Sequence, residues 1–400
     1  MYCKIRCIFL VFNQPASTMN RFIGPILALL LVCGIGYGGW VSYSKRQAAD
    51  NVRIEAAQME TVRGLIGSEK ESFYSDARVQ AILKKNGIAV QFEKVGSRAI
   101  AQRADLKNFD FAHPAGAPAA LKIQQIVKAQ QLYTPFFTPM VIASWRSLLP
   151  TLQAEGLVAQ EAGNYYLIDM PKLMSLMDKG MRWKDMKGNT TYLTSKSVLV
   201  SSTDVRRSNS AAMYLALASY VANGNNVVQS DAEMQKILPL MGSIFLKQGF
   251  QEASSAGPFE DYLSMGIGKA PLVMIYESQF LEYRMRAASA AASASAATAS
   301  AGDASQEMVL LYPRPTIFTK HVLVAITPKG QKLGALLESD AGLQALAVEY
   351  GYRTTAQPAF AKRMQEAKLA VPLTLVDVID PPSFEVLERM VVEIEKKYTQ

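Results

Sequence analysis

The chain carries small hydroxyl and amide side chains where predicted strands give way to predicted helices. Ser68, Ser97 and the neighbours Ser208 and Asn209 stand at such places. The first amides of a helix lack intrahelical partners, and with a hydroxyl and the helix dipole they bind an anion without a charged side chain. Ser and Asn are also the usual helix N-caps, so one such residue alone is explained by structure. Their recurrence at successive strand ends makes a ligand site as good an explanation as ordinary caps.

Residues suited to catalysis or metal binding are few. The only histidines are His113 and His321, and no H-E-x-x-H or P-loop motif is present. Asp204 and Glu277 follow predicted strands, where a cap, a hinge partner or a ligand contact explains a carboxylate better than a general acid does. We therefore expect no catalytic residue, no metal site and no cofactor.

Alternating strands and helices would position these residues. Strands are predicted over 61–66, 88–95, 109–112, 197–200, 270–276, 308–312 and 321–326. Helices are predicted over 69–85, 118–128, 211–222, 331–337, 343–350 and 383–397. This alternation indicates an α/β fold.

Composition excludes several classes of protein. Of 400 residues, 50% are hydrophobic and 19% are charged, which excludes wholesale disorder. The three cysteines all lie in the first 33 residues, which excludes a disulfide-rich scaffold. The formal charge of +8 invites a nucleic-acid partner. Residues 1–46 carry +5 of that charge, which leaves only +3 for the rest of the chain, so we expect no nucleic-acid partner.

An uncharged apolar run lies near the start of the chain. Residues 22–41 have about the length that spans a bilayer core as a helix. Basic residues flank the run equally on both sides, so they do not orient it. We predict an uncleaved transmembrane anchor followed by a stalk at 42–57, with a cleaved signal peptide or a lipoprotein signal at Cys33 as alternatives. The preceding residues 1–21 include Met19, which is an alternative start.

Several segments resemble, in order and spacing, bacterial extracellular solute-binding proteins of the type II periplasmic-binding fold. The similarity is to the branch of molybdate and sulfate receptors. It rests on residues 67–68, 96–100, 109–118, 133–143, 202–214, 271–279, 311–313, 322–326 and 349–353. None of these motifs is specific alone, and the resemblance covers about residues 58–360.

The resemblance implies a fold of two α/β lobes that are joined by crossing strands and close on a ligand by hinge motion. It implies a first lobe of residues 58–139 and 315–400. The second lobe would be 140–314, with an Ala- and Ser-rich insertion at 287–304. The ligand-binding residues that it implies are Ser68, Ser97, Ala115, Ser208, Asn209, Tyr276 and Glu277.

These features predict a membrane-anchored solute-binding protein and not an enzyme. It would be a single-pass protein of the inner membrane whose binding domain faces the periplasm or the exterior. Its expected partners are a small-molecule ligand, with oxyanions among the candidates, and an ABC permease or a signalling protein. Because Glu277 would repel an oxyanion, cationic, zwitterionic and sugar-like ligands stay open. A sensor or scaffold with a degenerate cleft is one alternative, and an enzyme that uses Asp204 or Glu277 is another.

Overall fold

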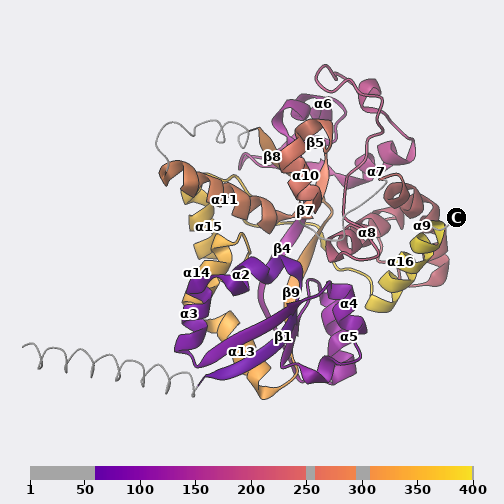
Figure 1. Cartoon of the computed structure of the whole chain (residues 1–400). Helices are drawn as coiled ribbons and strands as arrows, with labels where there is room; N and C mark the ends of the chain where they lie inside the picture. The colour runs from indigo at the N-terminus through magenta and orange to yellow at the C-terminus, as the bar shows by residue number, and fades with distance from the viewer. Residues whose placement is uncertain (1–58, 249–256, 294–306, 399–400) are drawn as a thin grey trace, which may run out of the picture. The chain divides into compact units, whose positions relative to one another are not determined.

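The computed structural model describes residues 59–248, 257–293 and 307–398 (Figure 1). The predicted anchor at 22–41, the stalk at 42–57 and most of the insertion at 287–304 lie outside these ranges. Within the described ranges, no helix has both the length and the apolar character needed to cross a bilayer. The chain divides into Met1–Met59 and Glu60–Gln400, and the following description concerns the second unit.

Sheet A contains the first strands of this unit. Strand β1 (Glu60–Ile66) lies between β2 (Ile88–Lys94) and β3 (Phe111–His113) and runs parallel to both. Strand β9 (Thr316–Ala325) pairs antiparallel with β3, and the first part of β4 (Gln131–Trp145) pairs antiparallel with β9. Parallel strands end at the same edge of a sheet, so the loops that follow β1 and β3 lie together.

Sheet B continues from the second part of β4. There β4 lies between β7 (Val273–Tyr276) and β8 (Met308–Arg314), antiparallel to both. Strand β8 pairs in parallel with β6 (Tyr166–Asp169), which pairs with β5 (Val158–Gln160). Strand β4 and the chain from β8 into β9 therefore both pass from one sheet to the other. The short β10 (Val378–Ile379) pairs with β9.

Helices cover both faces of each sheet (Figure 1). They are α2 (Glu71–Ser75), α3 (Ala77–Lys85), α4 (Ser97–Gln102), α5 (Ala117–Val127), α6 (Leu149–Ala154), α7 (Met170–Asp178), α8 (Asn209–Ala222), α9 (Asp231–Leu246), α10 (Gly257–Met265), α11 (Glu277–Ser293), α13 (Pro328–Ser339), α14 (Ala341–Glu349), α15 (Gln357–Glu366) and α16 (Phe384–Tyr398).

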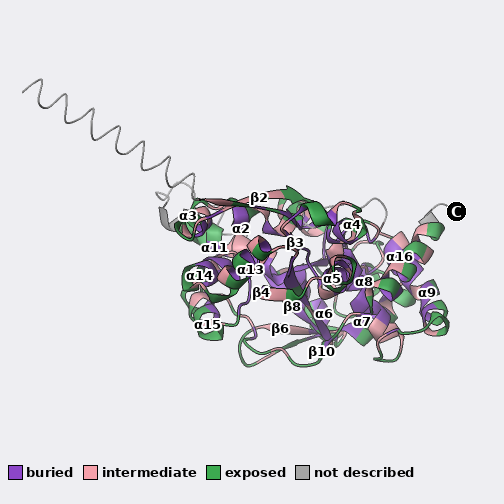
Figure 2. Ribbon diagram, turned by 90° about the horizontal axis from the view of Figure 1, so that it is seen from below, coloured by how far each residue is buried: buried purple, intermediate pink, exposed green. Residues whose placement is uncertain are grey.

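Each sheet face has its own apolar core. On sheet A, α2, α3, α13 and α14 cover one face, and α4 and α5 cover the other. On sheet B, α6, α7, α8, α9 and α16 cover one face, and α10, α11 and α15 cover the other. Strands β3 and β8 are consequently buried along nearly their whole length (Figure 2).

The helix predicted over 69–85 is interrupted. A 3-10 turn, η1 (Ser68–Lys70), leads into α2, and Asp76 separates α2 from α3. The Asp76 carboxylate accepts a hydrogen bond of 2.7 Å from the backbone N–H of Arg78, which caps α3. Asp favours this N-cap position, so it starts a new helix in the middle of an otherwise helical pattern.

The prediction of a strand over 197–200 is wrong. Only isolated bridges form there, at Ser197 and Ser201. Val198 and Val200 are nevertheless fully buried in the core of sheet B. The apolar run therefore reflects packing, because a short buried run looks the same in the sequence whether or not it joins a ladder.

Candidate functional site

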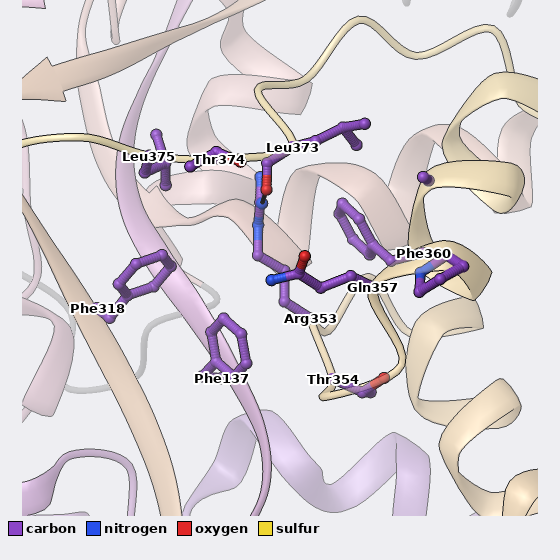
Figure 3. Close-up of a pocket in the computed structure, with 11 residues that line it drawn as sticks. Phe137, Phe318, Arg353, Thr354, Gln357, Phe360, Leu373, Thr374 and Leu375 are labelled. Carbon is purple, nitrogen blue, oxygen red and sulfur yellow. Dashed lines mark hydrogen bonds between the residues drawn. The ribbon is translucent and has the colours of Figure 1, made fainter.

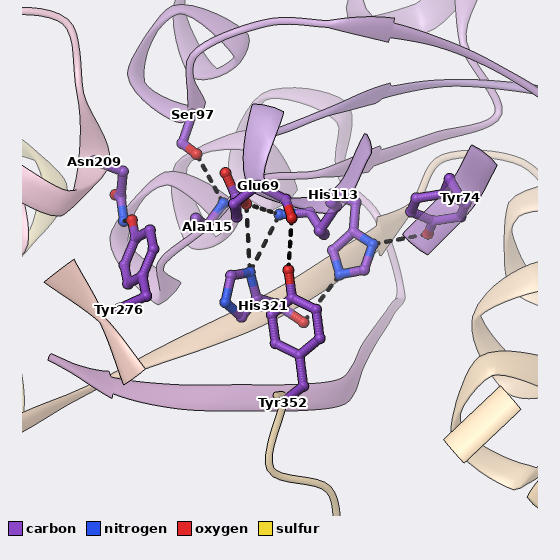
Figure 4. A network of polar contacts seen from close by, with 10 residues as sticks. Glu69, Tyr74, Ser97, His113, Ala115, Asn209, Tyr276, His321 and Tyr352 are labelled. Carbon is purple, nitrogen blue, oxygen red and sulfur yellow. Dashed lines mark hydrogen bonds and ion pairs between the residues drawn. The ribbon is translucent and has the colours of Figure 1, made fainter. Parts of the chain in front are cut away.

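Loops from both sheets meet where β9 crosses between the sheets (Figure 4). The turn η1 follows β1, Ala115 follows β3, and α4 begins at Ser97. From sheet B, α8 begins at Asn209 and β7 ends at Tyr276. We call the side chains gathered here the junction cluster: Glu69, Lys70, Ser97, His113, Ala115, Asn209, Tyr276, His321 and Tyr352.

A buried ion pair occupies the centre of the junction cluster. The Glu69 carboxylate contacts the Lys70 ammonium, and the Lys70 side chain has no exposed surface. Burial raises the pKa of Glu69, but the charge of Lys70 is the largest of the opposing effects, and the pKa lies below its ordinary value. A Cβ at Gly67 would lie 2.4 Å from Glu69 Oε1, which shows that the carboxylate folds back over the bare turn.

His321 contacts this pair through one nitrogen and leaves the other unused. Its Nδ1 lies 3.2 Å from Lys70 Nζ and 3.5 Å from Glu69 Oε1. Because an ammonium only donates, Nδ1 accepts and the ring hydrogen is on Nε2. Within the described part of the chain, this buried Nε2 has no hydrogen-bond partner. Burial and then Lys70 lower the pKa of His321 to about 4, so the ring is neutral at pH 7.

His113, in contrast, uses both of its ring nitrogens. Its Nε2 donates to the His321 carbonyl oxygen at 3.1 Å, and its Nδ1 accepts from the Tyr74 hydroxyl at 2.9 Å. Burial, followed by the positive charge of Lys70, holds the pKa of His113 well below its ordinary value. His113 is thus a neutral link that fixes β3 to β9 beside the ion pair.

Asn209 and Tyr276 reach the junction cluster from sheet B. The Asn209 amide nitrogen donates to the Tyr276 hydroxyl at 3.1 Å. The Tyr276 ring packs edge-on against His321, with ring centroids 6.0 Å apart and an interplanar angle of 69°. Burial, and then the charge of Glu69, raise the pKa of Tyr276, so the phenol keeps its hydrogen and remains a donor.

The loops of the two sheets are in direct contact. A Cβ at Gly96 would lie 3.0 Å from the Arg207 carbonyl oxygen. A Cβ at Gly116, whose φ is +108°, would lie 2.9 Å from Asn209 Oδ1. The sheets are therefore closed on each other, and the bare backbone of these glycines lets them approach.

Comparison with known proteins identifies the fold. No family model and no curated protein matches the chain. Iron-bound HitA from Pseudomonas aeruginosa matches it with a TM-score of 0.51 at 10% identity, over 84% of this chain and 99% of that one. A Bordetella ferric binding protein gives 0.47 at 12% identity, over 84% and 98%. The sulfate-binding protein SubI from Mycobacterium tuberculosis H37Rv gives 0.43 at 11% identity, over 80% and 93%.

The chain has the fold of a type II periplasmic solute-binding protein. The resemblance that the sequence indicated is therefore confirmed for the fold. At such low identities the likeness extends to the fold alone, so the site must be judged from the residues of this chain.

The structure brings together the predicted ligand residues Ser97, Ala115, Asn209 and Tyr276 (Figure 4). The backbone N–H of Ala115 donates to Ser97 Oγ at 2.7 Å, and both residues are buried. Ser97 and Asn209 were predicted from their places at the starts of helices, whereas Ala115 and Tyr276 were predicted only from the family resemblance.

The structure does not bring Ser68 and Ser208 into the cluster contacts. Ser68 is exposed at the start of η1. Ser208 is buried, but its Oγ lies 2.9 Å from Ser210 Oγ, which in turn lies 2.8 Å from Thr203 Oγ1. The Ser208 hydroxyl thus serves a local hydroxyl chain at the start of α8.

Glu277 lies apart from the cluster. Its carboxylate accepts hydrogen bonds of 2.7 Å from Arg353 Nε, from Arg353 Nη2 and from the Tyr312 hydroxyl. Arg353 also donates to the Pro372 carbonyl at 2.7 Å, and its backbone pairs with Phe137 of β4. We call Glu277, Tyr312 and Arg353 the crossing network, because it ties the crossing strand β4 to the C-terminal part of the chain.

A cavity of about 450 Å³ lies beside the crossing network (Figure 3). Phe137 of β4 and Phe318 of β9 line one part of it, with ring centroids 5.2 Å apart and nearly perpendicular planes. Phe360 and Leu373 line another part. None of the predicted ligand residues lines this cavity.

Five residues of the junction cluster were not predicted as site residues from the sequence: Glu69, Lys70, His113, His321 and Tyr352. Tyr352 donates to the Glu69 carbonyl at 2.8 Å and so supports η1. A signal was present for the histidines. His113 lies between apolar residues and His321 directly precedes the apolar run 322–326, where an ionisable side chain is unusual. No comparable signal marks the charged residues of η1.

Proposed function

We propose that this chain is an extracytoplasmic binding protein that captures a small solute between the loops of sheet A and sheet B. The observation that supports the proposal is the unpartnered Nε2 of His321, buried where those loops converge. In α/β sheets ligands sit outside the carboxyl ends of strands. A buried donor without a partner costs about 1–3 kcal/mol, which an acceptor on a solute would recover.

The donors of the junction cluster favour a solute rich in acceptor oxygens. His321 Nε2 and the Tyr276 hydroxyl both offer a hydrogen, whereas the charges of Glu69 and Lys70 cancel each other. An oxyanion would add a negative charge next to Glu69 without an additional cation in the cluster. We therefore place uncharged or zwitterionic oxygen-bearing solutes before oxyanions, and keep oxyanions as the second class.

We also propose the location, the lobes and the partner of this domain. Residues 22–41 would anchor it in the inner membrane, with the binding unit facing the periplasm or the exterior. The first lobe would comprise 58–139 and the part of 315–400 that packs on sheet A. The second lobe would comprise 140–314 together with α15 and α16, which pack on sheet B, so that β4 and β9 form the hinge. An ABC permease or a signalling protein would receive the liganded form.

A thermal-shift screen of the full chain tests the proposal. Sugars, amino acids and oxyanions are screened separately, and a solute at 100 times its Kd stabilises the folded protein by about 2.7 kcal/mol. The variant His321→Gln should lose the response. Ser339→Ala should keep it, because Ser339 is an exposed residue of α13 whose hydroxyl bonds only to its own helix in the described structure. No response to any of the three classes contradicts the proposal.

A sensor or scaffold with a degenerate cleft is the second candidate. It is favoured by the internal pairing of predicted ligand residues, Ser97 with Ala115 and Asn209 with Tyr276. On that alternative, the double variant Ser97→Ala and Asn209→Ala would leave the cellular function unchanged. Under the binding proposal, the same double variant loses it.

A further inference from the structure

Helix α16 packs in the core of sheet B and also contacts the core of sheet A. Its first residue, Phe384, packs against the sheet A core formed with α4 and α5. The rest of its apolar face lies in the core of sheet B, with Leu387, Met390 and Ile394 all buried. In Figure 1, α16 (yellow) lies beside α9 and close to α4 and α5. One helix therefore connects both sheets at a place separate from the crossing strands.

Ion pairs fix the start of α16 to sheet A. The Glu388 carboxylate accepts from Arg98 Nε of α4, at 2.6 and 2.7 Å to its two oxygens. Glu385 lies 3.0 Å from Lys122 Nζ of α5. The Arg98 and Glu388 side chains are only 20% and 18% exposed, so water screens this pair less than an ordinary surface pair.

The same helix and the same arginine also hold sheet B. Arg98 Nη1 donates to the Arg206 carbonyl, in the loop before α8. Arg389 of α16 lies 3.1 Å from Asp231, the first residue of α9. Arg98 is thus bonded both to α16 and to the loop before α8 of sheet B. This loop lies next to the junction cluster.

We propose that α16 is a strap that keeps the loops of sheet A and sheet B closed. Five apolar residues along most of α16 pack in the core of sheet B. In the described structure, its first turns are held to α4 and α5 by Phe384, Glu385 and Glu388. The sheet A end is therefore the end that releases. Opening of the junction cluster, and entry of the solute proposed above, requires this release.

Hydrogen exchange on the full chain, without any solute, tests the strap. The double variant Glu385→Gln and Glu388→Gln removes both ion pairs to sheet A and leaves the apolar face intact. Exchange of the backbone amides of α4 should become about tenfold faster, which corresponds to about 1.4 kcal/mol. The control Glu393→Gln, which breaks the pair with Lys396 within α16, should leave α4 exchange unchanged.

Two results would overturn the strap. One is unchanged exchange in α4 in the double variant and also in Phe384→Ala, which removes the apolar contact with sheet A. The other is exchange that rises equally in β1 and β3, since this would show global destabilisation. The inference rests on the proposed function only for solute entry. If α4 exchange became faster in the double variant, the strap would be supported. If the chain then bound no solute in the thermal screen, only the proposed function would be contradicted.

Discussion

The molecule buries two charged networks that differ in how completely they are satisfied. In the crossing network, both oxygens of Glu277 accept hydrogen bonds, from Arg353 and Tyr312. In the junction cluster, Glu69 and Lys70 neutralise each other, but His321 Nε2 has no partner in the described structure. A fully satisfied buried network fixes a structure, whereas a partly satisfied one leaves a group for another molecule. The comparison therefore separates a structural ion pair from a candidate ligand site.

The largest effect is expected from Arg353→Ala in the crossing network. Glu277 has no exposed surface, so the variant leaves a buried carboxylate without its cation. We expect a loss of about 4–5 kcal/mol in the free energy of unfolding. Urea unfolding of the full chain measures it. The double variant Arg353→Met and Glu277→Leu should recover most of the loss, and a loss below about 1 kcal/mol for Arg353→Ala would show that this network is not structural.

A somewhat smaller loss is expected from Lys70→Met in the junction cluster. The Glu69 side chain keeps 8% exposure, so its unpaired carboxylate is less costly than that of Glu277. We expect a loss of about 3–4 kcal/mol, read from urea unfolding. Adding Glu69→Gln should restore most of it, because both charges are then gone. Equal losses in the single and the double variant would mean that the charges do not interact.

The pH dependence of stability separates the networks further. The pKa of His321 is lowered to about 4 in the folded chain and is about 6.5 in an unfolded one. Above pH 6.5 the ring is neutral in both states and contributes nothing. As the pH falls from 6.5 to 4, only the unfolded chain takes up the proton, so stability falls by about 3 kcal/mol from this group.

Unfolding at a series of pH values checks this window. His113, whose pKa is also lowered, adds to the loss, whereas the low pKa of Glu69 makes its carboxylate lose stabilisation only at more acid pH. His321→Gln should therefore flatten the profile between pH 6.5 and 4 without removing it. An unchanged profile in that variant would mean that His321 is not held neutral.

Sequence patterns predicted much of sheet A but little of the helical cover of sheet B. The strand predicted over 61–66 is β1, which is one residue longer. It could be predicted because its apolar residues all pack within one sheet. Helix α9 was not predicted, although Ser230 and Glu233 form a capping box at its start. Pro239 lies inside it, and a proline normally ends a helix in a sequence pattern. Tertiary packing on sheet B overrides that local cost.

Site residues were predictable only where they lie at the end of a strand or at the start of a helix. Asn209 was predicted because the start of a helix faces a sheet edge, whereas Tyr276 was predicted from the family resemblance, as the last residue of a strand. Glu277 was selected as the neighbour of Tyr276, but β7 ends at Tyr276 and α11 begins at Glu277, so the two side chains enter different networks. Whether Glu69 turns inward depends on Gly67 and on His321, which is far away in sequence.

The smallest change in stability, and the most specific test of the comparison, is expected from Asn209→Ala. It removes one hydrogen bond to Tyr276, so unfolding should lose about 1 kcal/mol. Its matched control is Asn226→Ala, which removes an amide hydrogen bond of 3.0 Å to Gly224 in an exposed turn. Both variants should lose similar stability, but only Asn209→Ala should weaken the solute response found in the thermal screen, since Asn209 orients the phenol that donates. Equal solute responses in the two variants would place the cluster with the crossing network, as a purely structural feature.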